Sequence, residues 1–94
     1  MIFTTDELSK IEIEDNVTQL NIIVDVHGMK CREVKRFLNN IINLIRGRYL
    51  MTVIHGYIHG NAIEEMIAKE TINYKITKRY QDTWHYGVTY LQVS

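Results

Sequence analysis

Residues 20–28 have the sequence LNIIVDVHG, and the other elements of the fold can be derived from this stretch. The run from Leu20 to Val26 is rich in β-branched residues and almost continuously apolar, which is typical of a strand buried on both faces. The run stops at His27 and Gly28, where we expect the strand to end. The segments that follow it extend this strand into a larger unit.

The segment after the strand has the pattern of an amphipathic helix. Its apolar side chains recur at three- and four-residue spacing and predict a helix with the stripe Cys31, Val34, Phe37, Leu38, Ile41, Ile42 and Ile45. Gly47 ends this helix, and residues 49–54, YLMTVI, predict a second strand. A strand, helix and strand in this order form a right-handed crossover between two parallel strands.

The remainder of the chain predicts a second helix and a hairpin. Asn61 and Glu64 have the spacing of a capping pair, so we expect a helix near residues 61–70. Alternation over residues 74–79, a polar tip over 81–86 and the run GVTYLQV over 87–93 predict an antiparallel hairpin. The order β-α-β-α-β-β predicts an α/β fold with a mixed sheet. Its helices pack either on one face, in two layers, or on both faces.

We expect one domain over residues 20–94, preceded by an acidic N-terminal segment over residues 1–19. That segment holds five acidic residues and one basic residue, a formal net charge of −4, although the whole chain has a net charge of zero. Ile11 and Ile13 alternate weakly with acidic residues. The segment is therefore either an added edge strand or unordered.

Composition limits the cellular compartments and the partners that we expect for the protein. Cys31 is the only cysteine among 94 residues, which excludes a disulfide within the chain and indicates a reducing, cytoplasmic compartment. The sequence predicts neither a signal peptide nor a membrane-spanning run. Six of the 11 basic residues lie between Lys30 and Arg48, either as a solvated helix face or as a surface that contacts phosphate.

Asp25, His27 and His55 are the candidate catalytic residues. Asp25 and His27 are two apart at a strand end, so their side chains project to the same side. His55 ends the parallel strand in the same way. We call the two strand ends, His27-Gly28 and His55-Gly56, the His-Gly corners, and both should meet in the crevice outside the carboxyl ends of the strands. One His-Gly pair alone usually marks a turn whose histidine makes structural hydrogen bonds. Two such corners and an aspartate are harder to explain by packing.

Phosphate is expected beside these residues. Gly56 and Gly60 flank a loop before the second helix, whose N-terminal amides suit an anion, and His59 could add a donor. The hairpin tip around Trp84 interleaves basic and aromatic residues, which indicates either a surface that binds a nucleic-acid strand or ordinary cross-strand pairs.

These motifs resemble the Smr (small MutS-related) domain family. The matching residues are Val24-Asp25-Val26-His27-Gly28, then His55-Gly56-Tyr57-Ile58-His59-Gly60, then Gly87-Val88-Thr89. The resemblance covers residues 20–94. It implies a two-layer α/β fold like the C-terminal domain of bacterial translation initiation factor 3, and nicking or endonuclease activity on DNA or RNA.

Three positions depart from the family pattern. Ile58 stands where a central glycine is usual, so the phosphate loop takes a different path. Tyr57 replaces a frequent basic residue and offers a ring on which a base could stack. Lys30 replaces a frequent capping threonine and adds positive charge beside His27.

We therefore predict a nucleic-acid nicking endonuclease, working either by acid-base chemistry or with a divalent metal, magnesium or manganese. The alternatives are a DNA- or RNA-binding module without catalysis, and a protein-interaction or dimerisation module that uses the acidic segment. No residue is assigned as a metal ligand, and no membrane partner is expected. The residues expected to contact phosphate or nucleic acid are Gly28, Lys30, Arg32, Gly56, Tyr57, His59, Gly60 and Trp84.

Overall fold

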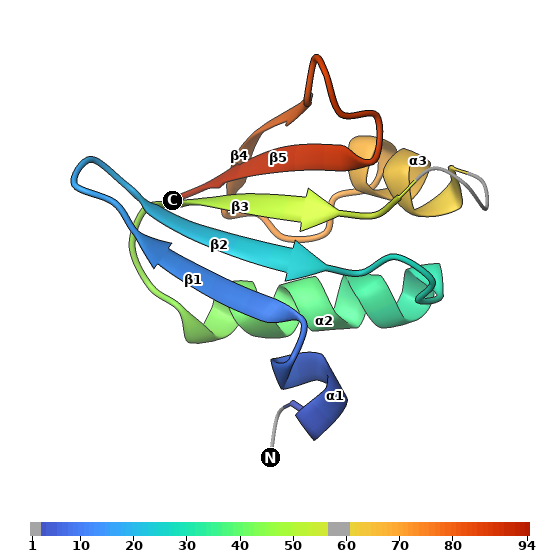
Figure 1. Ribbon diagram of the computed structural model, residues 1–94, viewed down its shortest axis with the longest axis horizontal. Helices are drawn as coiled ribbons and strands as arrows, with labels where there is room; N and C mark the ends of the chain where they lie inside the picture. Colours follow the sequence, from blue (N-terminus) through green and yellow to red (C-terminus); the bar gives the residue numbers. More distant parts are fainter. Residues whose placement is uncertain (1–2, 57–60) are drawn as a thin grey trace.

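The structure is a computed structural model that describes residues 3–56 and 61–94. Its five strands form one mixed sheet in the order β1-β2-β3-β5-β4, in which β2 and β3 are parallel and the other neighbours antiparallel (Figure 1). This confirms the predicted α/β class and mixed sheet. The elements are α1 (Thr5–Leu8), β1 (Ile11–Asp15), β2 (Leu20–Asp25), α2 (Cys31–Leu44), β3 (Tyr49–Ile54), α3 (Ala62–Lys69), β4 (Ile76–Gln81) and β5 (Val88–Val93).

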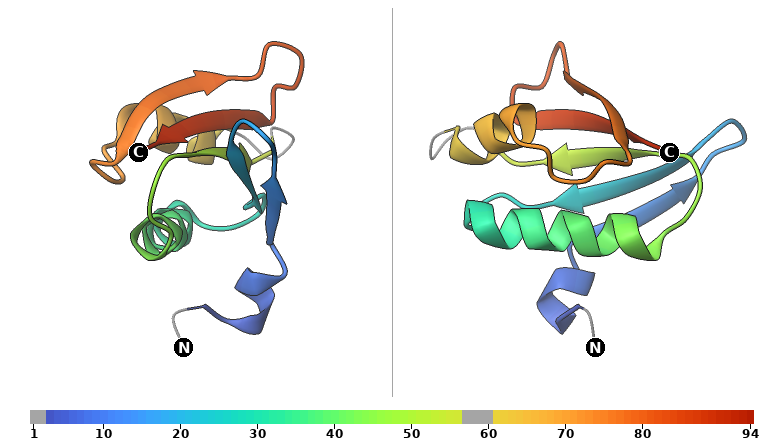
Figure 2. Two further views of the ribbon diagram at one scale, coloured as in Figure 1. Left: turned by 90° about the vertical axis from the view of Figure 1, so that its left-hand side faces the viewer. Right: turned by 180° about the vertical axis from the view of Figure 1, so that it is seen from behind.

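Both α2 and α3 lie on the same face of the sheet, so of the two predicted arrangements the structure has the one with two layers (Figure 2). The core lies between these layers. Alternate strand residues are buried against the helices, namely Ile22, Val24, Tyr49, Met51, Val53, Leu91 and Val93. They meet the stripe of α2, where Val34, Phe37, Leu38, Ile41 and Ile42 are buried.

The other face of the sheet, which we call the open face, carries no helix of the described residues. The expectation that the strand over residues 20–26 is buried on both faces is therefore wrong. Ile23 and Asp25 lie on the open face and are only half-buried. Ile23 pairs with Glu12 of β1 and Thr52 of β3, and these cross-strand neighbours shield it in part without a covering layer. The apolar run of residues 20–26 therefore belongs to a central strand of a sheet that is covered by helices on one face only.

The acidic N-terminal segment forms an edge strand, which is one of the two predicted alternatives. β1 pairs antiparallel with β2, and α1 is closed by reciprocal bonds between Thr4 and Glu7, each 3.0 Å long. Phe3 packs edge-on against Phe37 of α2, with ring centroids 5.8 Å apart. Residues 16–19 join β1 to β2 in a short turn with a fully exposed Val17.

The second helix and the hairpin form close to the predicted positions, but the predicted capping pair does not. Asn61 occupies the N-cap of α3, and its side-chain amide donates to Glu65 (3.2 Å) rather than accepting from the helix backbone. β4 begins at Ile76, later than predicted, because Asn73 ties the preceding segment to α2. The Asn73 amide donates to the side-chain oxygens of Asn39 (3.0 Å) and Asn43 (3.2 Å).

Tyr49 is fully buried, and its hydroxyl has no hydrogen-bond partner among the described residues. Burial raises the pKa of Tyr49 to about 12. A buried, unpaired hydroxyl costs free energy because it loses its bonds to water. We therefore expect Tyr49→Phe to raise the free energy of unfolding in urea by about 1 kcal/mol at neutral pH.

The same tyrosine gives a pH dependence. The pKa of Tyr49 is higher in the folded chain than its ordinary value of 10.0, so the folded state favours the protonated hydroxyl. The resulting contribution to the free energy of unfolding is complete below pH 10 and is lost as pH rises toward 12. Tyr49→Phe should lose less stability than the parent over that interval. Tyr90→Phe is the control at neutral pH, because the Tyr90 hydroxyl donates to Asp82 and its removal should not stabilise. A less stable Tyr49→Phe variant would contradict the prediction.

Candidate functional site at the carboxyl edge of the sheet

The two His-Gly corners lie side by side, as predicted. β2 and β3 end at the same edge of the sheet, and β5 begins there (Figure 1). The Val26 amide donates to the Ile54 carbonyl over 2.9 Å and extends the parallel ladder past the strand ends. A Cβ atom placed on Gly56 would lie 3.4 Å from Cβ of His27, so the backbone of the second corner contacts the first.

Asp25 and His27 form an exposed pair on the open face. Nδ1 of His27 is hydrogen-bonded to Oδ1 of Asp25, and the His27 backbone amide donates to the same oxygen over 3.3 Å. Because a carboxylate only accepts, Nδ1 carries the proton and Nε2 of the neutral ring keeps its lone pair. The His27 side chain is 68% exposed, and no described residue bonds to its Nε2. The pair can therefore exchange a proton with a bound molecule.

His55 is not brought together with this pair. Asp25 pairs with Ile54, so the next residue, His55, projects to the opposite face of the sheet, toward the helices. It is only 5% exposed. Nδ1–H of His55 donates to the Gly56 carbonyl (2.9 Å), and the Thr89 hydroxyl donates to Nε2 (2.8 Å). The expected cleft containing both imidazoles does not form, because the two strands present these residues with opposite alternation.

Thr89 is a residue whose role the sequence did not predict. The triplet Gly87-Val88-Thr89 was noticeable only as part of the family resemblance, whereas the structure shows Thr89 buried on β5 and bonded to His55. Gly87 has a further contact, since its carbonyl accepts from the backbone amides of both His55 (2.9 Å) and Gly56 (3.1 Å). These bonds attach the start of β5 to the second corner.

Lys30 and Arg32 lie at the start of α2, beside the first corner. Gly28 has a φ of +79°, a conformation that favours glycine, and turns the chain from β2 toward the helix. The Lys30 amide donates to Oε1 of Glu33 over 3.2 Å, which satisfies one free donor of the helix. A hollow of about 380 Å³ here is lined by Lys30, Arg32, Glu33 and Arg36. Its lining has three cations and one carboxylate, and because Arg36 also pairs with Glu7 over 3.9 Å, the positive charge left unpaired among the described residues lies at Lys30 and Arg32.

The hairpin contains residues that fit each of the two predicted interpretations. Tyr80 and Tyr90 form a cross-strand pair with ring centroids 5.4 Å apart. Arg79 turns to the end of α3 and donates to the carbonyls of Ile67 (3.1 Å) and Ala68 (3.3 Å), so it caps a helix. Trp84, in contrast, is 84% exposed in the loop between β4 and β5. The predicted contacts at Tyr57, His59 and Gly60, and the departure at Ile58, lie outside the described residues.

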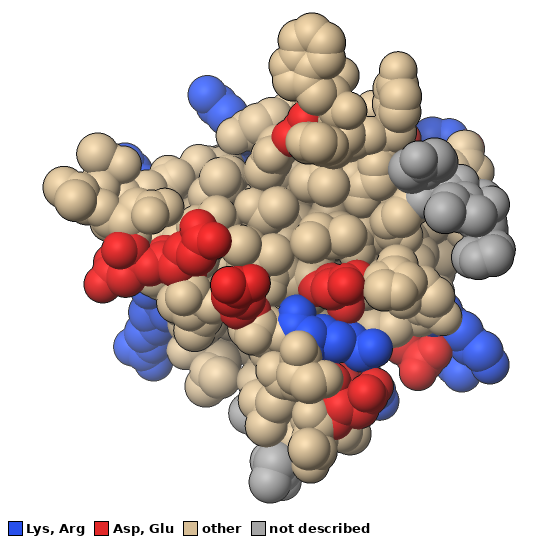
Figure 3. Space-filling view, viewed as in Figure 1, with Lys and Arg blue, Asp and Glu red and all other residues tan. Residues whose placement is uncertain are grey.

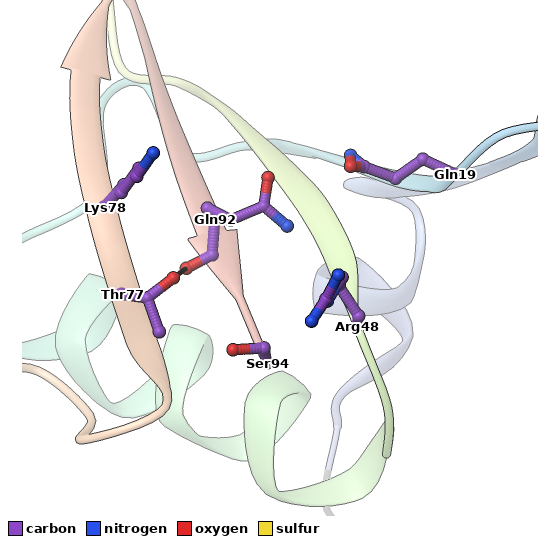
Figure 4. A pocket seen from close by; sticks show the side chains of 6 residues that line it. All are labelled: Gln19, Arg48, Thr77, Lys78, Gln92 and Ser94. Carbon is purple, nitrogen blue, oxygen red and sulfur yellow. Dashed lines mark hydrogen bonds between the residues drawn. The ribbon is translucent and has the colours of Figure 1, made fainter.

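A second polar hollow, of about 410 Å³, lies at the opposite end of the sheet (Figure 4). Sequence reasoning missed it because only the fold brings its residues together, from two loops and two strands: Gln19, Arg48, Thr77, Lys78, Gln92 and Ser94. The Thr77 hydroxyl donates to the Gln92 carbonyl, and the Gln92 amide donates to the Tyr49 carbonyl, each over 3.2 Å. Its two cations, Arg48 and Lys78, make it a suitable comparison for the hollow at α2.

Over residues 3–56 and 61–94, no three histidine, cysteine or acidic side chains lie close enough together to hold a metal ion. None of the helices described is long and apolar enough to cross a membrane. No protein-family model, curated protein or solved structure was found to match the chain.

The bond between His55 and Thr89 gives a stability prediction. Thr89→Val keeps the shape of the side chain but leaves Nε2 of a buried histidine without a donor. We expect the free energy of unfolding to fall by about 1–3 kcal/mol, measured with urea. Thr77→Val is the control, because its hydroxyl is exposed and its loss should cost less than about 0.5 kcal/mol. Equal effects of both substitutions would show that His55 is not held in this way.

Proposed function

We propose that the chain hydrolyses phosphodiester bonds in DNA or RNA at the Asp25–His27 pair, as a nicking endonuclease of the Smr type. One observation carries the proposal: an exposed imidazole is held by a carboxylate at the carboxyl edge of the sheet, beside a hollow with three cations. Ligands of open α/β sheets bind outside this edge. The proposed assignment to the Smr family, and the proposed likeness of the fold to the initiation-factor domain, are based on the resemblance of the motifs.

The pair suits His27 to the role of general base. Asp25 holds Nδ1–H, so Nε2 points away from the carboxylate and can take a proton from a water that attacks phosphorus. The new P–O bond forms as the bond to the leaving oxygen breaks, and that oxygen takes a proton from the imidazolium or from solvent. Asp25 also stabilises the imidazolium by its charge.

A divalent metal fits the same corner. Magnesium is often held by one or two carboxylates together with the phosphates of the substrate, and Asp25 provides one carboxylate here. Such an ion would neutralise charge on the phosphate. His27 would still orient and move the proton, since its bond to Asp25 uses one of the two carboxylate oxygens.

The charge distribution indicates which surface the nucleic acid would cover. Figure 3 shows the open face, where acidic side chains follow the lower part, over β1, with basic atoms among them, and further lysine and arginine side chains lie at the margins. Glu12 and Glu14 of β1 are exposed. These charges repel a phosphate backbone, so we place the substrate along the carboxyl edge, from the Asp25–His27 pair to Lys30 and Arg32.

The catalytic role of His27 can be tested by substitution. We expect His27→Ala to lower kcat for oligonucleotide cleavage by about 10²–10⁴-fold, which is the usual loss when a proton-transfer group is removed. Because the side chain is mostly exposed, the urea midpoint should change little. Tyr74→Ala removes an exposed ring at the opposite end of the sheet and is the control. A His27→Ala protein that cleaves as fast as its parent would refute the proposal.

A binding module without catalysis is the second candidate, and the burial of His55 favours it. That burial removes His55 from the pair of imidazoles that the sequence predicted for one cleft. The cationic hollow at α2 would then serve affinity alone. Parent protein that binds oligonucleotides but does not cleave them, with or without magnesium or manganese, would select this candidate.

Binding at the α2 hollow predicts a salt dependence. Affinity should fall steeply with salt as counterions are released from the nucleic acid, and Lys30→Gln combined with Arg32→Gln should reduce the slope of log K against log salt by about two. Arg48→Gln combined with Lys78→Gln removes the same charge from the opposite end of the sheet and should change the slope less. Equal changes would mean that the surface is not localised.

A further inference from the structure

The loop between β4 and β5 displays an exposed indole, with the exposed Tyr86 two residues later, at the edge of the sheet that carries the Asp25–His27 pair. Trp84 is 84% exposed. Because β5 runs antiparallel to β3, the loop before β5 lies at the end where β3 finishes, and it stands out from the sheet (Figure 1). Its sequence neighbours Asp82, Thr83 and His85 are polar, so Trp84 does not belong to a continuous apolar run.

Asp82 fixes the shape of this loop. Its Oδ1 accepts from the backbone amides of Trp84 (2.8 Å) and His85 (3.0 Å), and its Oδ2 accepts from the Tyr90 hydroxyl of β5. These bonds, chiefly the one from Tyr90, lower the pKa of the Asp82 carboxyl, which stays ionised at neutral pH. The amide of Asp82 donates to the Val88 carbonyl over 3.1 Å and closes the base of the loop. The backbone that carries the indole is therefore preorganised.

Backbone contacts connect the loop to the candidate active site. The loop ends at Gly87, whose carbonyl accepts from the amides of His55 and Gly56. A Cβ atom on Gly87 would lie 3.0 Å from Cα of Gly56, and one on Gly56 would lie 3.4 Å from Cβ of His27. These backbone contacts place the end of the loop against the second His-Gly corner, which in turn contacts Cβ of His27.

We propose that Trp84 stacks on an unpaired base of the same strand whose phosphate is cleaved at His27, so that the protein acts on single-stranded nucleic acid or on a single-stranded junction. This inference rests on the proposed function. An indole face binds any base and requires that the base be unstacked from its neighbours, which a continuous duplex does not offer. Protein partners favour broad apolar patches, whereas the exposed aromatic residues here, Tyr80, Trp84 and Tyr86, alternate with the polar residues Asp82, Thr83 and His85.

The test uses the fluorescence of Trp84, the only tryptophan of the chain. Short single-stranded DNA or RNA should quench the emission in a saturable way, and a blunt duplex of the same sequence should not. Trp84→Ala should raise KM for single-stranded cleavage by about 10-fold, the order expected for one stacked base, with little change in kcat. Trp84→Phe should lose less, because it keeps an aromatic face.

Tyr74→Ala is the matched control. Tyr74 is also 84% exposed but precedes β4 at the end of that strand remote from the loop, so KM should not change. Asp82 acts as a positioning residue. Asp82→Ala should raise KM as Trp84→Ala does, whereas Asp82→Asn keeps an acceptor oxygen and should restore most of the loss. Equal unfolding free energies for the two Asp82 variants would separate positioning from folding.

The outcomes separate this inference from the proposed function. Quenching by single strands without cleavage would overturn the catalytic proposal and retain the base-stacking role of Trp84. Cleavage without quenching, with KM unaffected by Trp84→Ala, would overturn the inference alone. Equal quenching by single strands and duplex would also overturn it. No quenching and no cleavage with any nucleic acid would overturn both, and would leave the indole as a contact for a protein.

Discussion

The parallel pairing of β2 with β3 is the constraint on which the rest of the structure depends. The crossover through α2 makes both strands run in the same direction, so both must finish at the same edge of the sheet. That edge receives the two His-Gly corners, the start of α2 and the beginning of β5. A chain with the same residues in an antiparallel pair would place Asp25 and His55 at opposite ends. The strand topology therefore brings the corners of the candidate site together, and the side chains then determine its chemistry.

Much of this architecture could be predicted because it depends on local patterns. The helix stripe from Val34 to Ile42, the strand YLMTVI and the closing hairpin each show their own period in the sequence. The contact between Asp25 and His27 was equally accessible, since two residues of one strand end share a side. No such local signal decided whether β1 forms, because Ile13 remains exposed and the strand gains its order mainly from pairing with β2.

The features that sequence reasoning missed depend on register between distant segments. Whether His55 faces the same side as Asp25 is decided by the pairing of Asp25 with Ile54, a relation between strands that no spacing within either one shows. The partner of His55 is Thr89, 34 residues later in the chain. Arg79 likewise looked like part of a basic surface, and its bonds to the end of α3 appear only once the hairpin is packed against that helix.

The short turn over residues 16–19 has a practical consequence. It joins the two strands at the end of the sheet remote from the His-Gly corners, and its Val17 points entirely into solvent. Exposed loop tips of this kind accept extra residues at little entropic cost. A fluorescent peptide, an affinity handle or a second domain inserted there would project away from the edge that carries the candidate site. The protein can therefore be immobilised or tethered through this turn with the His-Gly corners left accessible.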